Sequence, residues 1–260
     1  MAKAFRCKTC SARAKGAWFI FAIIATLSIT AVGLALYPLP LNQQSSSAPS
    51  SASPQSPSKV SVVGGANPNA AVQPVGPELL KNLIGASPPL GSESAPITIY
   101  EFADYQCPNC QSWWISVKPL LVENSIKTGK AKLIMVEFPF LGKDSFSAAQ
   151  AAKCAGEQGR YWEYHDTLYS EQKGIDTGWA SIEKLKKFAS ELGLDMAFNT
   201  CLDSGKYSEI VKQSFKDGEK LVVPGTPTFF IVGPKGEVQK IVGSQPYVVF
   251  EKIIDSMLPE

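Results

Sequence analysis

The sequence lacks a marked excess of either charge and contains a single histidine, His165. Lys and Arg number 25 against 23 Asp and Glu, which gives a net charge of +2 over 260 residues. A chain this close to neutral lacks the basic surface that binds nucleic-acid phosphates, so we predict no nucleic-acid partner. No internal repeat is present either, and the length allows one domain of ordinary size together with additional segments.

Charge is also missing from residues 17–37, an apolar run of about 21 residues. This length matches the roughly 20 residues that cross a bilayer as a helix. Five basic residues precede the run: Lys3, Arg6, Lys8, Arg13 and Lys15. We therefore predict a basic cytoplasmic tail over 1–16, a single transmembrane helix over 17–37 that acts as a signal anchor, and an extracytoplasmic remainder. A cleaved signal peptide is the alternative, although its apolar part is normally shorter.

Large apolar side chains are sparse in residues 38–76, where Ser, Pro, Ala, Gly and Gln dominate and Lys59 is the only charge. Such a segment buries too little apolar surface to offset the entropy lost on ordering. We predict a flexible linker that holds a folded domain, residues 77–260, near the membrane.

The remaining residues predict an α/β domain in the order βαβ, helical insert, ββα. A strand rich in β-branched residues, a helix kinked at Pro119 and a second strand form the first unit, which implies a parallel pair with a crossover. A turn at Pro234-Lys235-Gly236 joins the last two strands. The expected elements are strands at about 97–102 and 131–138, a helix within 108–129, a helical insert at about 143–220, strands within 226–233 and 236–243, and a helix at 247–258.

Cys107 and Cys110 form a Cys-x-x-Cys pair directly after the first strand. Pro108 suits the first position of a helix, so Cys107 is expected at a helix N-terminus, where the unpaired amides lower the pKa of a thiol. Half of a zinc site is the alternative. It would need a second pair of ligands, and the other two cysteines of the domain are 47 positions apart, so we predict neither a metal nor another cofactor.

Three stretches, "FADYQCPNC", "AAKCAGEQGRYWEYHDTLY" and "VPGTPTFFIVG", resemble the DsbA branch of the thioredoxin-fold disulfide oxidoreductases. The resemblance covers about residues 91–258. It implies a thioredoxin-like fold with the helical insert between its two halves, and Cys107 and Cys110 as the catalytic pair. Pro108 and Asn109 are then the dipeptide that tunes the redox potential. It is Pro-Asn in this chain rather than the Pro-His found in the family.

The resemblance also gives a meaning to Thr226, Pro227 and Glu101. Thr226-Pro227 matches the family's cis-proline bond, whose exposed backbone pairs with an extended substrate; an ordinary loop proline is the alternative. Glu101 shares a strand face with Ile97 and Ile99 and matches the family's buried acid, which exchanges a proton with Cys110. The alternative is a glutamate at a strand end that points into solvent.

Cys154 and Cys201 are expected to form a structural disulfide, because the predicted compartment is oxidising and some members of the family that the chain resembles carry a bridge in the insert. Two separate buried thiols are the alternative. His165 lies in an aromatic stretch and is expected to serve packing. Cys7 and Cys10 form a second Cys-x-x-Cys on the cytoplasmic side, to which we assign no function.

Together these features predict a membrane-anchored, extracytoplasmic thiol–disulfide oxidoreductase that forms disulfides in exported proteins. Its expected partners are exported proteins with free thiols, and a membrane redox partner that reoxidises Cys107 and Cys110. A reductase or isomerase of the same fold would leave the same pattern. A tethered binding or chaperone domain with an inert disulfide is the alternative outside this class.

Overall fold

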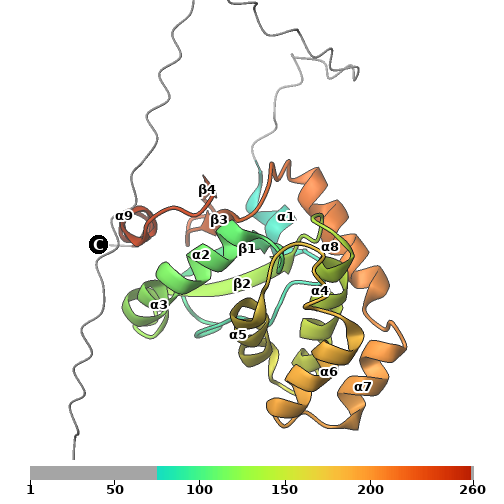
Figure 1. Ribbon diagram of the computed structural model, residues 1–260. Coiled ribbons are helices and arrows are strands. Elements are labelled where there is room, and N and C mark those ends of the chain that lie inside the picture. Colours follow the sequence, from blue (N-terminus) through green and yellow to red (C-terminus); the bar gives the residue numbers. More distant parts are fainter. Residues whose placement is uncertain (1–74, 259–260) are drawn as a thin grey trace, which may run out of the picture. The chain divides into compact units, whose positions relative to one another are not determined.

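The computed structural model describes residues 75–258, which form a four-stranded sheet with helices on both faces (Figure 1). The predicted tail, the predicted transmembrane helix, all but the end of the predicted linker, and Cys7 with Cys10 lie outside the described residues. Within 75–258, no helix is both long enough and apolar enough to cross a bilayer. The strands are β1 (Ile97–Ala103), β2 (Ala131–Glu137), β3 (Thr228–Val232) and β4 (Val238–Val242).

The helices follow the predicted order, with five of them between the two halves of the sheet. In chain order they are α1 (Pro77–Lys81), α2 (Pro108–Ser116), α3 (Lys118–Leu121), the π-helical turn η1 (Val122–Ile126), α4 (Lys143–Gly156), α5 (Tyr161–Glu171), α6 (Ile182–Glu191), α7 (Met196–Asp203), α8 (Ser208–Lys220) and α9 (Tyr247–Met257).

The sheet has the strand order β2-β1-β3-β4, with β1 and β2 parallel and the other two pairings antiparallel. The predicted parallel pair with a crossover and the predicted hairpin are both present. At the hairpin turn Gly236 has a φ of +84°, a conformation that suits glycine because it has no Cβ. The thioredoxin-like fold with a helical insert is thereby confirmed.

The two faces of β1 are both covered, so its side chains alternate between two apolar layers. Ile97 and Ile99 pack with residues of α2 and α9, such as Trp113 and Phe250. Tyr100 and Phe102 pack on the opposite side with residues of α1, β2 and β3. Because side chains alternate along a strand, Glu101 points to the same side as Ile99, under α2.

The helix expected within 108–129 is divided more sharply than the predicted kink. It ends at Ser116, Val117 has a φ of −114°, and α3 and η1 continue the chain. Pro119 explains the break, because it has no N–H to donate to the carbonyl of Ile115 and its ring clashes with that group.

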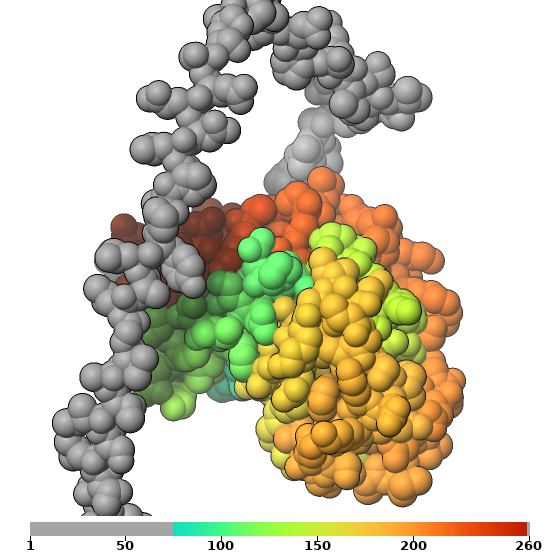
Figure 2. Space-filling view, viewed as in Figure 1, coloured from blue at the N-terminus to red at the C-terminus, as the bar shows by residue number. Residues whose placement is uncertain are grey.

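The insert, α4 to α8, forms a rounded lobe beside the sheet, drawn in yellow-green to orange (Figure 2). Small residues let α4 pack closely in this lobe: Ala148, Ala151, Ala152 and Ala155 are all buried. The cluster they join also contains Cys107 and Cys110. The Cys-x-x-Cys pair therefore lies at the junction between the sheet and the insert.

Candidate active site

Cys107 is the residue that caps the N-terminus of α2, and Cys110 lies in the first turn of that helix. Both are buried, with 5% and 0% of their surface exposed, whereas Pro108 and Asn109 between them are exposed. The Pro108-Asn109 dipeptide therefore faces solvent, and the sulfur-bearing residues on either side of it are buried. Within residues 75–258 these are the two cysteines that are not in a disulfide.

The pKa values of the two thiols are shifted in opposite directions, that of Cys107 mainly by a hydrogen bond and that of Cys110 mainly by burial. A hydrogen bond from the thiol of Cys110, with smaller contributions from Thr226 and from the backbone amides of Cys110 and Asn109, lowers the pKa of Cys107 to about 6, against the opposing effect of burial. Burial raises the pKa of Cys110 well above its ordinary value, and its hydrogen bond to Cys107 adds to this. At neutral pH the site holds one thiolate and one thiol.

Thr226 and Pro227 lie directly opposite the redox pair, just before β3. The peptide bond between them is cis, and the carbonyl oxygen of Thr226 lies 3.3 Å from Cys107 Sγ, from which it accepts a hydrogen bond when Cys107 is protonated. The hydroxyl of Thr226 is buried and helps to lower the pKa of Cys107. The sequence placed this dipeptide near the active sulfur through the family resemblance alone, and the structure brings the two together.

Glu101 is buried on the central strand β1, with 1% of its surface exposed, so it does not point into solvent. Burial raises its pKa to about 8, although the charge of Lys118 works in the opposite direction. One carboxylate oxygen, Oε2, has no hydrogen-bond partner in the described structure. A carboxyl group with this pKa takes up and releases a proton near neutral pH.

A buried cation beneath the site was not predicted. Lys118, on α3, forms an ion pair with Asp166 of α5, and its side chain is 8% exposed. The same oxygen, Asp166 Oδ1, accepts hydrogen bonds from Trp114 Nε1 at 2.7 Å and His165 Nδ1 at 2.9 Å. Lys118 and Asp166 are far apart in the sequence, so no local pattern links them. A lysine between the apolar residues Val117 and Leu121 was the available signal.

His165 itself packs among aromatic rings, as expected. It is buried and lies about 5 Å, between ring centroids, from both Trp162 and Tyr169. Burial lowers its pKa to about 4, so the imidazole is neutral at pH 7. Its Nδ1 then donates to Asp166, and it helps to hold that carboxylate in place.

Two glutamines, also not predicted, hold the loop that leads to Cys107. Gln172, from the end of α5, donates to the carbonyls of Tyr105 and Cys107. Gln106 donates to Ser145 Oγ at 2.8 Å and to Asp176 Oδ1 at 3.2 Å. The insert therefore supplies polar groups that fix the backbone just before the helix N-terminus. Such contacts depend on the tertiary fold and leave no spacing in the sequence.

The second cysteine pair lies wholly within the insert. Cys154 of α4 and Cys201 of α7 are joined by a disulfide with a Cα–Cα distance of 5.8 Å. The structure thus joins the two cysteines that the sequence suggested, and Cys107 and Cys110 remain available to form the redox-active disulfide. Among residues 75–258, no group of three or more His, Cys, Asp or Glu side chains is arranged to hold a metal ion.

A thioredoxin fold with Cys-x-x-Cys at a helix N-terminus and a cis-proline opposite defines a thiol–disulfide oxidoreductase. The family model described as thioredoxin matches residues 85–256, and the chain belongs to this family, in its DsbA-like branch. The probable disulfide bond formation protein D of Bacillus anthracis is 34% identical over 149 residues, which cover 55% of this chain and 69% of that protein. The disulfide bond formation protein D of Bacillus subtilis is 26% identical over 153 residues, or 57% of this chain and 68% of that protein.

Solved structures agree with this assignment. Alpha-DsbA1 of Wolbachia pipientis is 27% identical, with a TM-score of 0.60 over 70% of this chain and 95% of that one. Oxidised BdbD of Bacillus subtilis has the same fold at 24% identity, with a TM-score of 0.59 over 66% of this chain and 92% of that one. The chain is a DsbA-like enzyme of thiol–disulfide exchange.

Proposed function

We propose that this enzyme works as an oxidase that forms disulfides in exported proteins, with Cys107 as the sulfur that substrates attack. The observation that carries the proposal is the difference in acidity between the two thiols of one helix turn. Cys107 has a pKa of about 6, whereas that of Cys110 is raised well above the ordinary value. A stable Cys107 thiolate favours the reduced enzyme, and an enzyme that prefers to be reduced oxidises its substrates.

The reaction proceeds in two exchanges. A substrate thiolate attacks Cys107 Sγ, the Cys107–Cys110 bond breaks, and the electron pair leaves on Cys110, which takes up a proton. A second substrate thiolate then attacks the substrate sulfur of the mixed disulfide and releases Cys107 as a thiolate. The substrate gains a disulfide, and the enzyme keeps two electrons. A membrane redox partner removes these electrons and restores the Cys107–Cys110 bond.

The neighbouring residues divide the remaining work. Glu101, buried beneath the pair with a pKa of about 8, gives its proton to Cys110 in the first exchange and takes it back on reoxidation. The backbone of Thr226, held beside Cys107 by Pro227, pairs with an extended substrate segment. Pro108 and Asn109 face solvent between the two cysteines and tune the potential.

The acidity of Cys107 contributes to the oxidising power. A pKa one unit below pH 7 stabilises the thiolate by about 1.4 kcal/mol, which is about 30 mV for a two-electron couple. The test is the reduction potential of Cys107–Cys110 measured against glutathione. A value above about −200 mV supports an oxidase, because it lies above the cytosolic glutathione potential. A value at or below that of thioredoxin, about −270 mV, identifies a reductase and removes the proposal.

The location of the enzyme is the second part of the proposal. Residues 1–16 stay in the cytoplasm, and residues 17–37 anchor the chain in the membrane. Residues 38–76 link this anchor to the catalytic domain, residues 77–260, which works outside the cytoplasm. The basic residues before the apolar run support this orientation. A protease added to right-side-out vesicles should cut within 38–76 and release the domain. A domain that stays protected until the membrane is broken would reverse the orientation.

A further inference from the structure

The disulfide between α4 and α7 is covered unequally on its two sides. Cys154 is 1% exposed and Cys201 is 5% exposed. A hollow of about 360 Å³ in the described surface borders Cys201 and is lined by Glu157, Ala197, Thr200, Cys201, Ser204 and Lys206. Cys154 does not line it. Cys201 is therefore the cysteine of this pair that the hollow reaches.

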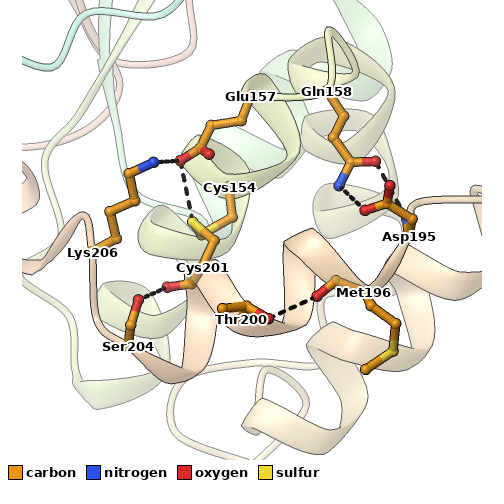
Figure 3. The surroundings of a disulfide bond; sticks show 9 residues. All are labelled: Cys154, Glu157, Gln158, Asp195, Met196, Thr200, Cys201, Ser204 and Lys206. Carbon is orange, nitrogen blue, oxygen red and sulfur yellow. Dashed lines mark hydrogen bonds and ion pairs between the residues drawn. A yellow bond between two sulfur atoms is a disulfide. The ribbon is translucent and has the colours of Figure 1, made fainter.

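Two opposite charges lie beside that sulfur. Glu157, at the end of α4, reaches over Cys201, with Lys206 next to it (Figure 3). Glu157 Oε1 is 3.4 Å from Cys201 Sγ, and Lys206 Nζ is 2.8 Å from the same oxygen. At 3.4 Å the carboxylate oxygen touches the sulfur, so no other atom fits between them. The hydrogen bond from Lys206 lowers the pKa of Glu157, which therefore stays ionised at neutral pH.

We propose that Cys201 is a site of attack by small thiols, and that Glu157 and Lys206 form a charge gate that selects them by charge. Glu157 repels an anionic thiol and covers part of the sulfur surface. Lys206 attracts the same thiol and partly cancels the effect of Glu157. The site is separate from the redox pair, so this proposal stands apart from the oxidase function.

The exchange at this site conserves atoms and electrons. A thiolate forms a bond to Cys201 Sγ, the bond to Cys154 breaks, and its electron pair leaves on Cys154 Sγ, which takes a proton from solvent. A second thiolate then attacks the sulfur of the small thiol in the mixed disulfide. It releases an oxidised small disulfide and leaves two reduced protein thiols.

The leaving sulfur makes the first step easy to reverse. Cys154 lies in the last turn of α4, where the helix C-terminus disfavours negative charge. Its surroundings are also buried, which disfavours a thiolate further. The Cys154 thiolate therefore attacks the mixed disulfide again unless a second thiol arrives. Glu157 and Lys206 therefore control the rate of a slow reduction of the Cys154–Cys201 disulfide, which otherwise stays intact.

The experiment compares three thiols of different charge on the oxidised protein: 3-mercaptopropionate, 2-mercaptoethanol and cysteamine. After an acid quench and alkylation, peptide masses give the rate of opening at Cys154–Cys201 and the position of the first adduct. Each rate is divided by the rate of the same thiol with an uncharged small disulfide, which removes differences in intrinsic reactivity. Reduction of Cys107–Cys110 occurs on a separate peptide and does not interfere.

The two charge variants should move the rates in opposite directions. In Glu157→Gln the rate with 3-mercaptopropionate, relative to cysteamine, should rise by about threefold to tenfold. In Lys206→Met the same ratio should fall by a similar factor. Glu209→Gln and Lys212→Met are matched controls, because these residues form an exposed ion pair on α8 and alter the net charge equally. They should leave the ratio unchanged.

Specific outcomes would overturn the gate. A first adduct on Cys154 would show that the hollow does not direct the attack. Charge ratios that are the same in wild type and both variants would show that neither charge selects the thiol. A change in the same direction in Glu157→Gln and Lys206→Met, or an equal change in the α8 controls, would reduce the effect to altered stability or net charge.

Discussion

The two cysteine pairs of this enzyme are buried to the same degree and yet have opposite chemical roles. Cys107 and Cys201 are each 5% exposed, and their partners Cys110 and Cys154 are 0% and 1% exposed. All four belong to one buried cluster. Exposure therefore does not explain why we assign exchange to one pair and a structural role to the other.

The position of each sulfur on its helix does explain the difference. Cys107 begins α2, so the Cys110 thiol one turn further on donates a hydrogen bond to its sulfur, and with the backbone amides of that turn it stabilises a thiolate. Cys154 and Cys201 lie near the ends of α4 and α7, where carbonyl groups disfavour a thiolate, and Glu157 adds a negative charge beside Cys201. A disulfide exchanges readily where its sulfurs can carry charge, and persists where they cannot.

The largest expected effect separates the two sulfurs of the active pair. In Cys110→Ser, Cys107 can still form a mixed disulfide by attacking a substrate disulfide, but the attack by Cys110 that would release the substrate is lost, so substrates should accumulate on Cys107. Cys107→Ser should trap almost none, because Cys110 is fully buried. Both variants should lose all turnover. Non-reducing gels of the cell envelope, with the adducts mapped by mass, measure the trapping. Equal trapping by both variants would contradict the asymmetry.

Removal of the structural bridge should change stability and spare catalysis. The residues are separated by 47 positions, and a loop of that size is expected to contribute about 4 kcal/mol to the free energy of unfolding. Cys154→Ala/Cys201→Ala should therefore unfold at lower denaturant concentration while the reduction potential of Cys107–Cys110 stays close to wild type. If the stability is unchanged and the potential moves instead, the bridge belongs to the redox function.

The sequence was sufficient for the elements whose signals are local. Strand composition, the helix start at Pro108 and the family motifs predicted the βαβ, insert, ββα order and the position of Cys107. The polar groups around the site could not be predicted in this way. Lys118 meets Asp166, and Gln106 meets Asp176, only because the insert folds back against the first strand–helix unit. Contacts of this kind are set by tertiary packing and have no fixed spacing.

Glu101 tests the proposed proton exchange beneath the active pair. Its pKa is about 8 in the folded protein and about 4.5 when exposed. The folded protein therefore has the full stability that this group allows below about pH 4.5, where the carboxyl is protonated in both states. The free energy of unfolding then falls as the pH rises toward 8. Compared with oxidised Glu101→Gln, oxidised wild type should lose unfolding free energy between pH 5 and 8, by at most about 3 kcal/mol, because the Cys107 charge that helps to raise this pKa is absent from the oxidised form.

The kinetic consequence of the same substitution is slower turnover across pH 6–8, because Cys110 loses its proton partner. Denaturation at several pH values and stopped-flow exchange with a peptide thiol measure the two effects. Parallel stability curves for wild type and Glu101→Gln would show that the carboxyl ionises normally. An unchanged exchange rate would remove its role in proton exchange.

The smallest effect reports the acidity of Cys107 directly. Its pKa is about 6 in the folded reduced enzyme and 9.0 for an ordinary thiol. Between these values the unfolded chain binds more protons, so the reduced form gains stability as the pH rises, and this gain is lost as the pH falls through about 6. The oxidised form has no thiol to titrate. The difference in unfolding free energy between the two forms should therefore grow by about 1 kcal/mol from pH 6 to pH 7.

Thermal unfolding of both forms in the Glu101→Gln background, which removes the titrating carboxyl, isolates the effect. A difference that is flat up to pH 8 would place Cys107 among ordinary thiols and make the two cysteine pairs electrostatically alike.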